Sequence, residues 1–200
     1  PRLGRHRSDR HIAIAEAFFD YHIRNVSDRY DFDSVRIGIQ PFSSDFRGFL
    51  FQDSQLGIRF FGDRDNNIFQ YNLAWFRRLE KDTNSLLNHI ERKVRDDDIF
   101  IANLYWQDFP VLGFQSQVTG VYNRNNEAGD FFFNDNEFIE RPASFGSERG
   151  RNYDVVYLGY NGDGHFDRLN LTTSFYTALG SNRDSAFTDE TADIQAFFFA

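Results

Sequence analysis

The stretch RLNLTTSFYTAL, from Arg168 to Leu179, decides how the rest of the chain is interpreted. Its residues alternate between two sides, with Leu169, Leu171, Thr173, Phe175 and Leu179 on one and Asn170, Thr172, Ser174 and Tyr176 on the other. A period of two over about ten residues predicts a β-strand with one apolar and one polar face. With the segment 153–160 it predicts a β-hairpin, and such strands are long enough to cross a bilayer at a tilt.

The composition favours some functional classes over others. The net charge of −8 argues against nucleic-acid binding, which needs a basic surface to neutralise phosphates. The absence of Cys excludes disulfides and thiolate chemistry. Of the 22 basic residues only Lys81 and Lys93 are lysines, whereas soluble β-proteins commonly place lysines on their sheet edges.

The two ends of the sequence predict an incomplete chain. It contains no Met, begins at Pro1 without a basic and apolar leader, and stops at Ala200 inside an expected strand. We therefore expect residues 1–200 to form one partial domain that is truncated at both ends. No run of about twenty apolar residues is present, so no transmembrane helix is expected.

Hydrophobic alternation predicts nine strands separated by polar segments. A helix competes with the first strand, 11–23, because Ala and Glu favour helices. Pro41 is expected to end the second strand because proline cannot donate to a ladder, and the apolar spacing within 84–94 indicates a short helix. The expected strands are 11–23, 34–40, 56–61, 68–76, 99–109, 114–123, 153–160 and 168–179, with a ninth that begins near residue 192.

The segments between these strands alternate in length. The long ones are 41–55, 77–98 and 124–152, the short ones are 62–67, 110–113 and 161–167, and 180–191 is intermediate. Outer-membrane barrels show this asymmetry, and the amides and hydroxyls of the polar faces suit a water-filled lumen. We therefore predict an all-β fold, an antiparallel up-and-down transmembrane β-barrel of which about nine strands are present. The same alternation also occurs in soluble sandwiches and barrels.

Several segments resemble those of known membrane proteins. VRIGIQPF (35–42), followed by DFRGF (45–49), is similar to large outer-membrane barrels of Gram-negative bacteria and resembles the alginate-export-type porins. YNLAWF (71–76) and YLGY (157–160), followed by GDGH (162–165), resemble uncharacterised outer-membrane proteins of this broad type. The resemblance covers most of the chain. It implies an outer-membrane location, a large even number of strands, arginines that line the pore, and a path for anionic saccharides or other small anions.

Arginines are the leading candidates for contact with a solute. Arg36 and Arg59 fall on the lumen faces, and a guanidinium can bind carboxylates or phosphates with two hydrogen bonds. The alternative is that these arginines pair with Glu16 and Asp20 and only fill the lumen. The expected pore-lining residues are Arg36, Arg59, Arg47, Glu16, Asp20, Gln70, Asn72, Asn103, Tyr105, Asn170, Thr172 and Tyr176.

The segment 161–167 has oxygen ligands at alternate positions, with Asp163, His165 and Asp167 as the candidates in a calcium-like turn. It lacks the distant bidentate Glu of an EF-hand, and Gly and Asp are common in turns, so we favour a plain turn and expect no metal site. No zinc spacing, nucleophile elbow, P-loop or dinucleotide fingerprint occurs in the sequence. We therefore expect no enzyme and no cofactor.

The favoured function is an outer-membrane, porin-like channel for the passive passage of small polar solutes, among them anions or saccharides. Its expected partners are the lipid bilayer and these solutes. The alternative is a soluble β-sandwich or barrel that binds carbohydrate through Trp75 and Trp106, and a third is a structural barrel that anchors a partner. A membrane barrel exposes its apolar strand faces as one exterior belt, whereas a soluble protein buries them in a closed core.

Overall fold

The computed structural model describes residues 12–82, 85–133, 139–141, 150–185, 188 and 190–200, and these residues form an all-β fold. No helix among them is long and apolar enough to cross a membrane. The strands are β1 (Ala13–Ile14), β2 (Ala17–Asn25), β3 (Phe32–Ser43), β4 (Gln52–Arg64), β5 (Phe69–Arg77), β6 (Asn88–His89), β7 (Asp97–Gln107), β8 (Phe114–Asn126), β9 (Phe132–Phe133), β10 (Ile139–Arg141), β11 (Asn152–Phe166), β12 (Leu169–Asn182) and β13 (Ala192–Phe199).

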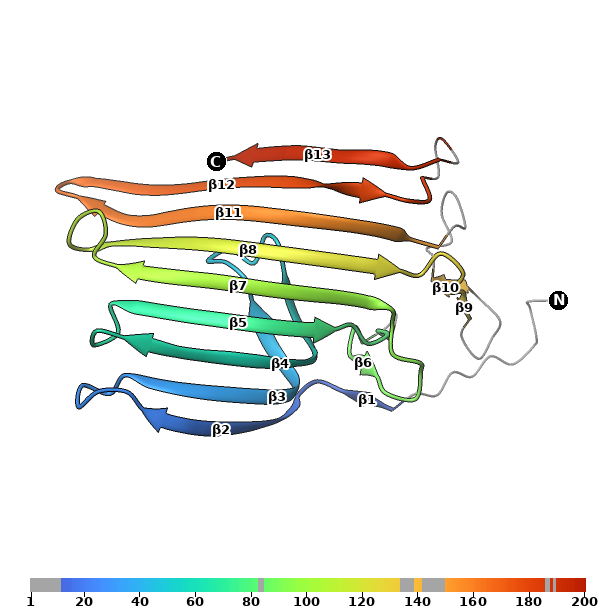
Figure 1. Cartoon of the computed structure of the whole chain (residues 1–200), viewed down its shortest axis with the longest axis horizontal. Coiled ribbons are helices and arrows are strands. Elements are labelled where there is room, and N and C mark those ends of the chain that lie inside the picture. Colours follow the sequence, from blue (N-terminus) through green and yellow to red (C-terminus); the bar gives the residue numbers. More distant parts are fainter. Residues whose placement is uncertain (1–11, 83–84, 134–138, 142–149, 186–187, 189) are drawn as a thin grey trace.

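Nine of these strands form one antiparallel sheet in the order β13-β12-β11-β8-β7-β5-β4-β3-β2 (Figure 1). The short pairs β1–β6 and β9–β10 lie beyond one end of it. The all-β, antiparallel prediction is therefore confirmed. The two edge strands, β2 and β13, point in the same direction because nine strands alternate in direction (Figure 1). They cannot close the sheet by antiparallel pairing with each other, and no closure occurs among the described residues.

Several strands are longer than the sequence predicted. The prediction that Pro41 ends a strand is wrong, because β3 continues through it and Pro41 pairs with Ser54. The predicted turn 161–167 is also wrong, because residues 161–166 belong to β11 and only Asp167 and Arg168 connect that strand to β12. Glycine and aspartate favour a turn there, but both neighbouring strands continue the ladder alongside Gly162, Asp163 and Gly164.

Two further predictions differ from the structure. The expected strand 11–23 is interrupted, so that Glu16 lies between β1 and β2 rather than on a strand face, and His11 lies outside the described residues. The helix indicated within 84–94 is absent from the described residues 85–94. There, Leu86 has a left-handed φ of 60°, and β6 pairs with β1.

The connections alternate in length as predicted. The segments 26–31, 65–68, 108–113 and 167–168 join the strands at one end of the sheet, on the left in Figure 1. The longer segments 78–96, 127–151 and 183–191 join them at the other end. The remaining connection, 44–51, is at neither rim and is described below.

One face of the sheet, the apolar face, is lined by exposed hydrophobic side chains. Alternate residues on each strand point to this face, and the register aligns them into rows that cross the strands. One row joins direct cross-strand partners on eight strands, each of them more than a third exposed: Phe19, Ile37, Ile58, Trp75, Phe100, Tyr122, Val156 and Leu179. No other described strand covers this face.

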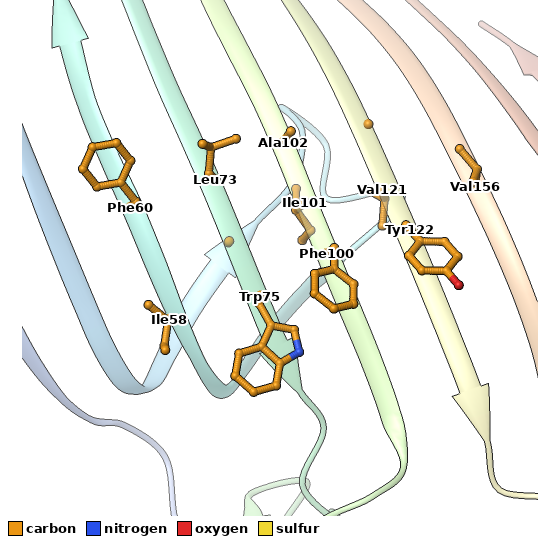
Figure 2. Close-up of a pocket in the computed structure, with 12 residues that line it drawn as sticks. Ile58, Phe60, Leu73, Trp75, Phe100, Ile101, Ala102, Val121, Tyr122 and Val156 are labelled. Carbon is orange, nitrogen blue, oxygen red and sulfur yellow. The ribbon is translucent and has the colours of Figure 1, made fainter.

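The apolar face changes character abruptly toward the long connections. Figure 2 shows Trp75, Phe100 and Tyr122 side by side on β5, β7 and β8, with ring centroids 6.4 and 6.0 Å apart. A row of charged residues lies two residues closer to the long connections, on β5, β7, β8 and β11. Its members are direct cross-strand partners of alternating charge: Arg77, Asp98, Arg124 and Asp154. Trp75 Nε1 donates to Asp98 Oδ1 at 2.9 Å, and Tyr122 OH donates to Asp154 Oδ1 at 3.0 Å. Aromatic rings thus separate an apolar band from a charged rim.

The opposite face, the polar face, carries amides, hydroxyls and arginines. Two of its rows of cross-strand partners are Asn72, Asn103, Thr119, Gly159 and Tyr176, and Gln70, Tyr105, Gln117, Asn161 and Ser174. A small buried apolar cluster interrupts this face, and it contains Phe42, Phe51, Ala74, Phe76, Ile99, Ile101 and Val121. The sequence did not predict that cluster, which packs under the connection between β3 and β4.

Candidate functional site: a hairpin inserted on the polar face

The distal part of the β3–β4 hairpin leaves the sheet and lies across the polar face. Pairing of β3 with β2 ends at Ile39, and pairing of β4 with β5 begins only at Leu56, so the residues between them pair only with each other. Figure 1 shows this segment passing behind β5, β7 and β8. We call residues 40–55 the inserted hairpin.

Glycine permits the sharp departure of this hairpin from the sheet. Gly38 and Gly57 are direct partners at the point of departure, and Gly38 has a φ of 130°. A Cβ on Gly57 would lie 2.3 Å from the backbone oxygen of Trp75 and 2.5 Å from a ring carbon of Phe76. Gly57 can lie this close to β5, and Gly38 this close to Ala17 and Phe18 of β2, only because neither residue carries a side chain.

Asp45 organises the tip of the inserted hairpin. Its Oδ1 accepts from the backbone N–H groups of Arg47 and Phe49, both at 3.0 Å. Its Oδ2 accepts from the backbone N–H of Leu50 at 3.1 Å and from the Ser44 hydroxyl at 2.9 Å. A carboxylate with four donors replaces the backbone pairing that a tight turn cannot supply.

These contacts decide the pKa of Asp45. Burial alone would raise it, but hydrogen bonds from the backbone amides of Phe49 and Leu50, the Ser44 hydroxyl and the Arg47 amide stabilise the carboxylate. The net result is a pKa below the usual 3.8. The tip is therefore built around an ionised carboxylate.

Three side chains of the sheet bind one backbone oxygen of the inserted hairpin. Ser44 O accepts from Asn103 Nδ2 at 3.1 Å, Gln117 Nε2 at 2.9 Å and Thr119 Oγ1 at 3.0 Å. Gln117 is fully buried, and its Oε1 also accepts from the backbone N–H of Phe46 at 3.1 Å. The hairpin is thus attached to β7 and β8 by several hydrogen bonds rather than resting loosely on them.

Aromatic rings complete the attachment. The ring of Phe49 stacks against Tyr176 of β12 and Phe198 of β13, with both pairs of centroids 4.8 Å apart. Phe51 stacks on Phe76 at 5.4 Å inside the buried apolar cluster. The inserted hairpin therefore reaches from its own strands to the far edge of the sheet.

The predicted arginines have different surroundings on the polar face. Arg36 is paired with Asp20 on the neighbouring strand, with Nη2 2.6 Å from Oδ2, which agrees with the structural alternative for this residue. Arg59 has no acidic partner among the described residues. Its Nε donates to Asn72 Oδ1 at 2.6 Å, and its guanidinium lies 4.4 Å from the centre of the Phe61 ring.

A chain of amides links Arg59 to the inserted hairpin. Asn72 accepts from Arg59 and donates to Asn103 Oδ1 at 2.8 Å, and Asn103 donates to Ser44 O. Two predicted pore-lining residues therefore serve to hold the hairpin, and their side chains are almost fully buried. The guanidinium is oriented by the same hydrogen-bond network that fixes the hairpin.

The other predicted site residues are dispersed. Arg47 is exposed at the hairpin tip, while Glu16 lies outside the sheet. The rest lie on the polar face with separate partners. Gln70 donates to Asn67 at 2.9 Å, Tyr105 contacts Phe46 with centroids 5.5 Å apart, Asn170 bonds His165, Thr172 donates to Asp163 at 2.5 Å, and Tyr176 donates to Asn161 at 2.8 Å.

The calcium-like candidates lie on one hairpin but form no cation site. Asp163 and His165 are on β11, where each contacts a side chain of β12, and Asp167 is in the turn. Across the described part of the chain, no group of three or more His, Cys, Asp or Glu residues is placed to hold a metal ion.

The inserted hairpin is the feature that sequence reasoning missed. The sequence predicts an ordinary loop over residues 42–55, because the segment is rich in Ser, Asp and Phe. A usable signal was present: three phenylalanines, Phe46, Phe49 and Phe51, follow Asp45 within six residues. So many rings in one connection predict that it packs against something.

Comparison with known proteins identifies no relative: no protein family, no curated protein and no solved structure matches this chain.

Proposed function

We propose that this chain forms part of the wall of an outer-membrane β-barrel that lets small polar solutes, among them anions or saccharides, pass by diffusion. The inserted hairpin narrows the passage. The observation that carries the proposal is the sidedness of the sheet: one face is apolar and uncovered, and the other is polar and holds an inserted hairpin. In water, an apolar face extending over nine strands would be a large unfavourable surface.

The apolar face matches what a bilayer requires. Its residues alternate strictly with those of the polar face, and the aromatic row of Trp75, Phe100 and Tyr122 lies between apolar residues and the charged rim. Transmembrane barrels place such aromatic residues at the membrane–water interface. A soluble sandwich would need a second sheet against this face, and the described residues supply none.

The polar face suggests the path of the solute. An inserted hairpin held by Gln117, Asn103 and Thr119 occupies space that would otherwise be open to water. Pore width and the charges beside the hairpin then select among solutes. Arg59 contributes the clearest positive charge, because Arg36 is already neutralised by Asp20.

The decisive experiment measures membrane insertion and conductance of the full-length protein. We expect it to fractionate with outer membranes, to need detergent for extraction, and to give discrete conductance steps in planar lipid bilayers. A protein that stays in the soluble fraction and binds saccharides through Trp75 or Trp106 would support the carbohydrate-binding alternative instead.

A second measurement tests the choice of solute charge. Arg59→Gln is expected to shift the reversal potential in a salt gradient toward cations, because it removes an unneutralised charge beside the hairpin. The double variant Asp20→Asn/Arg36→Gln removes an ion pair and leaves the net charge unchanged, so it serves as the matched control. Equal shifts in both variants, or none in Arg59→Gln, would remove anion selection from the proposal.

A further inference from the structure

A cavity of about 320 Å³ lies between the tip of the inserted hairpin and the sheet. Phe46 and Arg47 of the hairpin form one wall. The other wall comes from β8, β11 and β12, with the lining residues Gln115, Asn161, Gly162, Asp163, Thr172, Thr173 and Ser174. Cavities of this volume accommodate small organic molecules.

The cavity has opposite charges on its two walls. Arg47 is exposed, and its guanidinium makes no ion pair or hydrogen bond to any residue that the structure describes. Asp163 accepts a hydrogen bond from Thr172 Oγ1 and has no cationic partner within the same residues. Because the two charges do not pair with each other, both remain available to a ligand.

A buried donor in the cavity wall lacks an acceptor. Asn161 is 1 % exposed, and its Oδ1 accepts from Ser174 Oγ at 2.7 Å and from Tyr176 OH at 2.8 Å. Its Nδ2 has no hydrogen-bond partner among the described residues. Asn161 therefore fixes the hydroxyl groups of Ser174 and Tyr176, and Ser174 also lines the cavity.

We propose that this cavity binds a small zwitterion, of which a free α-amino acid is the simplest. The ligand carboxylate accepts from the Arg47 guanidinium, and the ligand ammonium donates to the Asp163 carboxylate. A simple anion would leave the Asp163 carboxylate unpaired, and an uncharged sugar would leave both charges without ionic partners. The inference rests on the proposed function, since the bound zwitterion is a solute held beside the hairpin that narrows the proposed path.

The test measures binding to the purified full-length protein in detergent by titration calorimetry. The probes are L-alanine, its carboxylate half propionate, its ammonium half ethylamine, and glucose. We expect L-alanine to bind, and each half to bind about tenfold or more weakly, because each loses one charge-assisted contact. Propionate that binds as tightly as L-alanine would overturn the proposal, as would the absence of binding by L-alanine.

Variants locate the binding. Arg47→Gln and Asp163→Asn are each expected to weaken L-alanine binding by about tenfold or more. Arg151→Gln and Asp167→Asn remove one positive and one negative charge outside the cavity. They should therefore leave the affinity for L-alanine unchanged. Unaltered affinity in Asp163→Asn overturns the proposal.

The same preparation, reconstituted in planar bilayers, separates the two claims. Conductance without L-alanine binding overturns this inference alone. Binding without any conductance overturns the proposed channel.

Discussion

The side chain of Gln117 on β8 and the backbone of Ser44 are the central contact between the sheet and the inserted hairpin. Gln117 Nε2 donates to Ser44 O at 2.9 Å, while Gln117 Oε1 accepts from the N–H of Phe46 at 3.1 Å. One amide thus satisfies a carbonyl and an N–H two residues apart, as a paired strand would do. The contact joins residues 73 positions apart and is fully buried at Gln117, so it fixes the position of the tip.

Gln117→Leu should loosen the hairpin. It leaves the Phe46 N–H without its acceptor, while Ser44 O keeps Asn103 and Thr119 as donors. We expect a loss of about 1–3 kcal/mol of unfolding free energy, the cost of one unsatisfied buried group. Hydrogen exchange should accelerate at residues 44–51. Gln195→Leu, an exposed site on the apolar face, is the control, and equal effects in both variants would contradict the assigned role of Gln117.

Acidification should release the tip through Asp45. Its folded-state pKa lies below 3.8, the value expected for the unfolded chain, so its stabilising effect is fully present above about pH 3.8. The effect is lost as the pH falls further through the folded-state pKa. We expect hydrogen exchange at residues 44–51 to rise over that acidic range, and the rise to be absent in Asp45→Asn, whose tip is weakened at every pH. If Asp45→Asn shows the same rise in hydrogen exchange on acidification, another carboxylate causes that rise. Asp167→Asn is the control and should respond to acid as the unaltered protein does.

Gly57→Ala should disrupt the bend at which the hairpin departs. The added Cβ would meet the backbone oxygen of Trp75 at 2.3 Å, which forces a backbone shift. We expect a loss of about 1–3 kcal/mol, as for overpacked sites, measured as a lower denaturant midpoint. Gly120→Ala is the matched control, because its Cβ would meet nothing closer than 3.8 Å. A similar loss in both variants would show that any side chain on a strand glycine is harmful.

The sequence predicted the two faces of the sheet well because alternation is a local property. In β7 and β12 each side chain points where a period of two places it, and this follows from strand geometry alone. Exposure of Ile37, Leu73, Leu171 and Phe175 agrees with this assignment. Strand ends were predicted poorly, since Asn161, Gly162, Asp163 and Gly164 are also turn formers, and only their pairing with β8 and β12 keeps them extended.

The inserted hairpin could not be predicted in the same way. Pro41 normally ends a strand, but β2 pairs with β3 only as far as Ile39, so Pro41 needs a partner on one side only. The contacts that hold the tip join Ser44 to residues of β7 and β8 more than fifty positions away. Nothing in the local sequence shows which distant amides will face Ser44. Nor does it show that Nδ2 of Asn161 will be buried without a hydrogen-bond partner among the described residues.

Leu73→Arg tests the environment of the apolar face most directly. Leu73 is 53 % exposed, and its cross-strand partners are Phe60 and Ala102. An arginine near the middle of a bilayer costs about 2–4 kcal/mol, and one near the interface about 0–1 kcal/mol. At an exposed site in water, most substitutions change the unfolding free energy by no more than about 0.5 kcal/mol. We therefore expect Leu73→Arg to lower the unfolding free energy of the protein in lipid vesicles by about 2–4 kcal/mol.

Ser181→Arg is the matched control for Leu73→Arg. Ser181 lies on the same face but in the charged row, as the partner of Asp154, and should lose no more than about 1 kcal/mol. Small and equal losses at both positions in lipid vesicles would mean that the apolar face does not contact the hydrocarbon core, and the proposed membrane wall would be wrong.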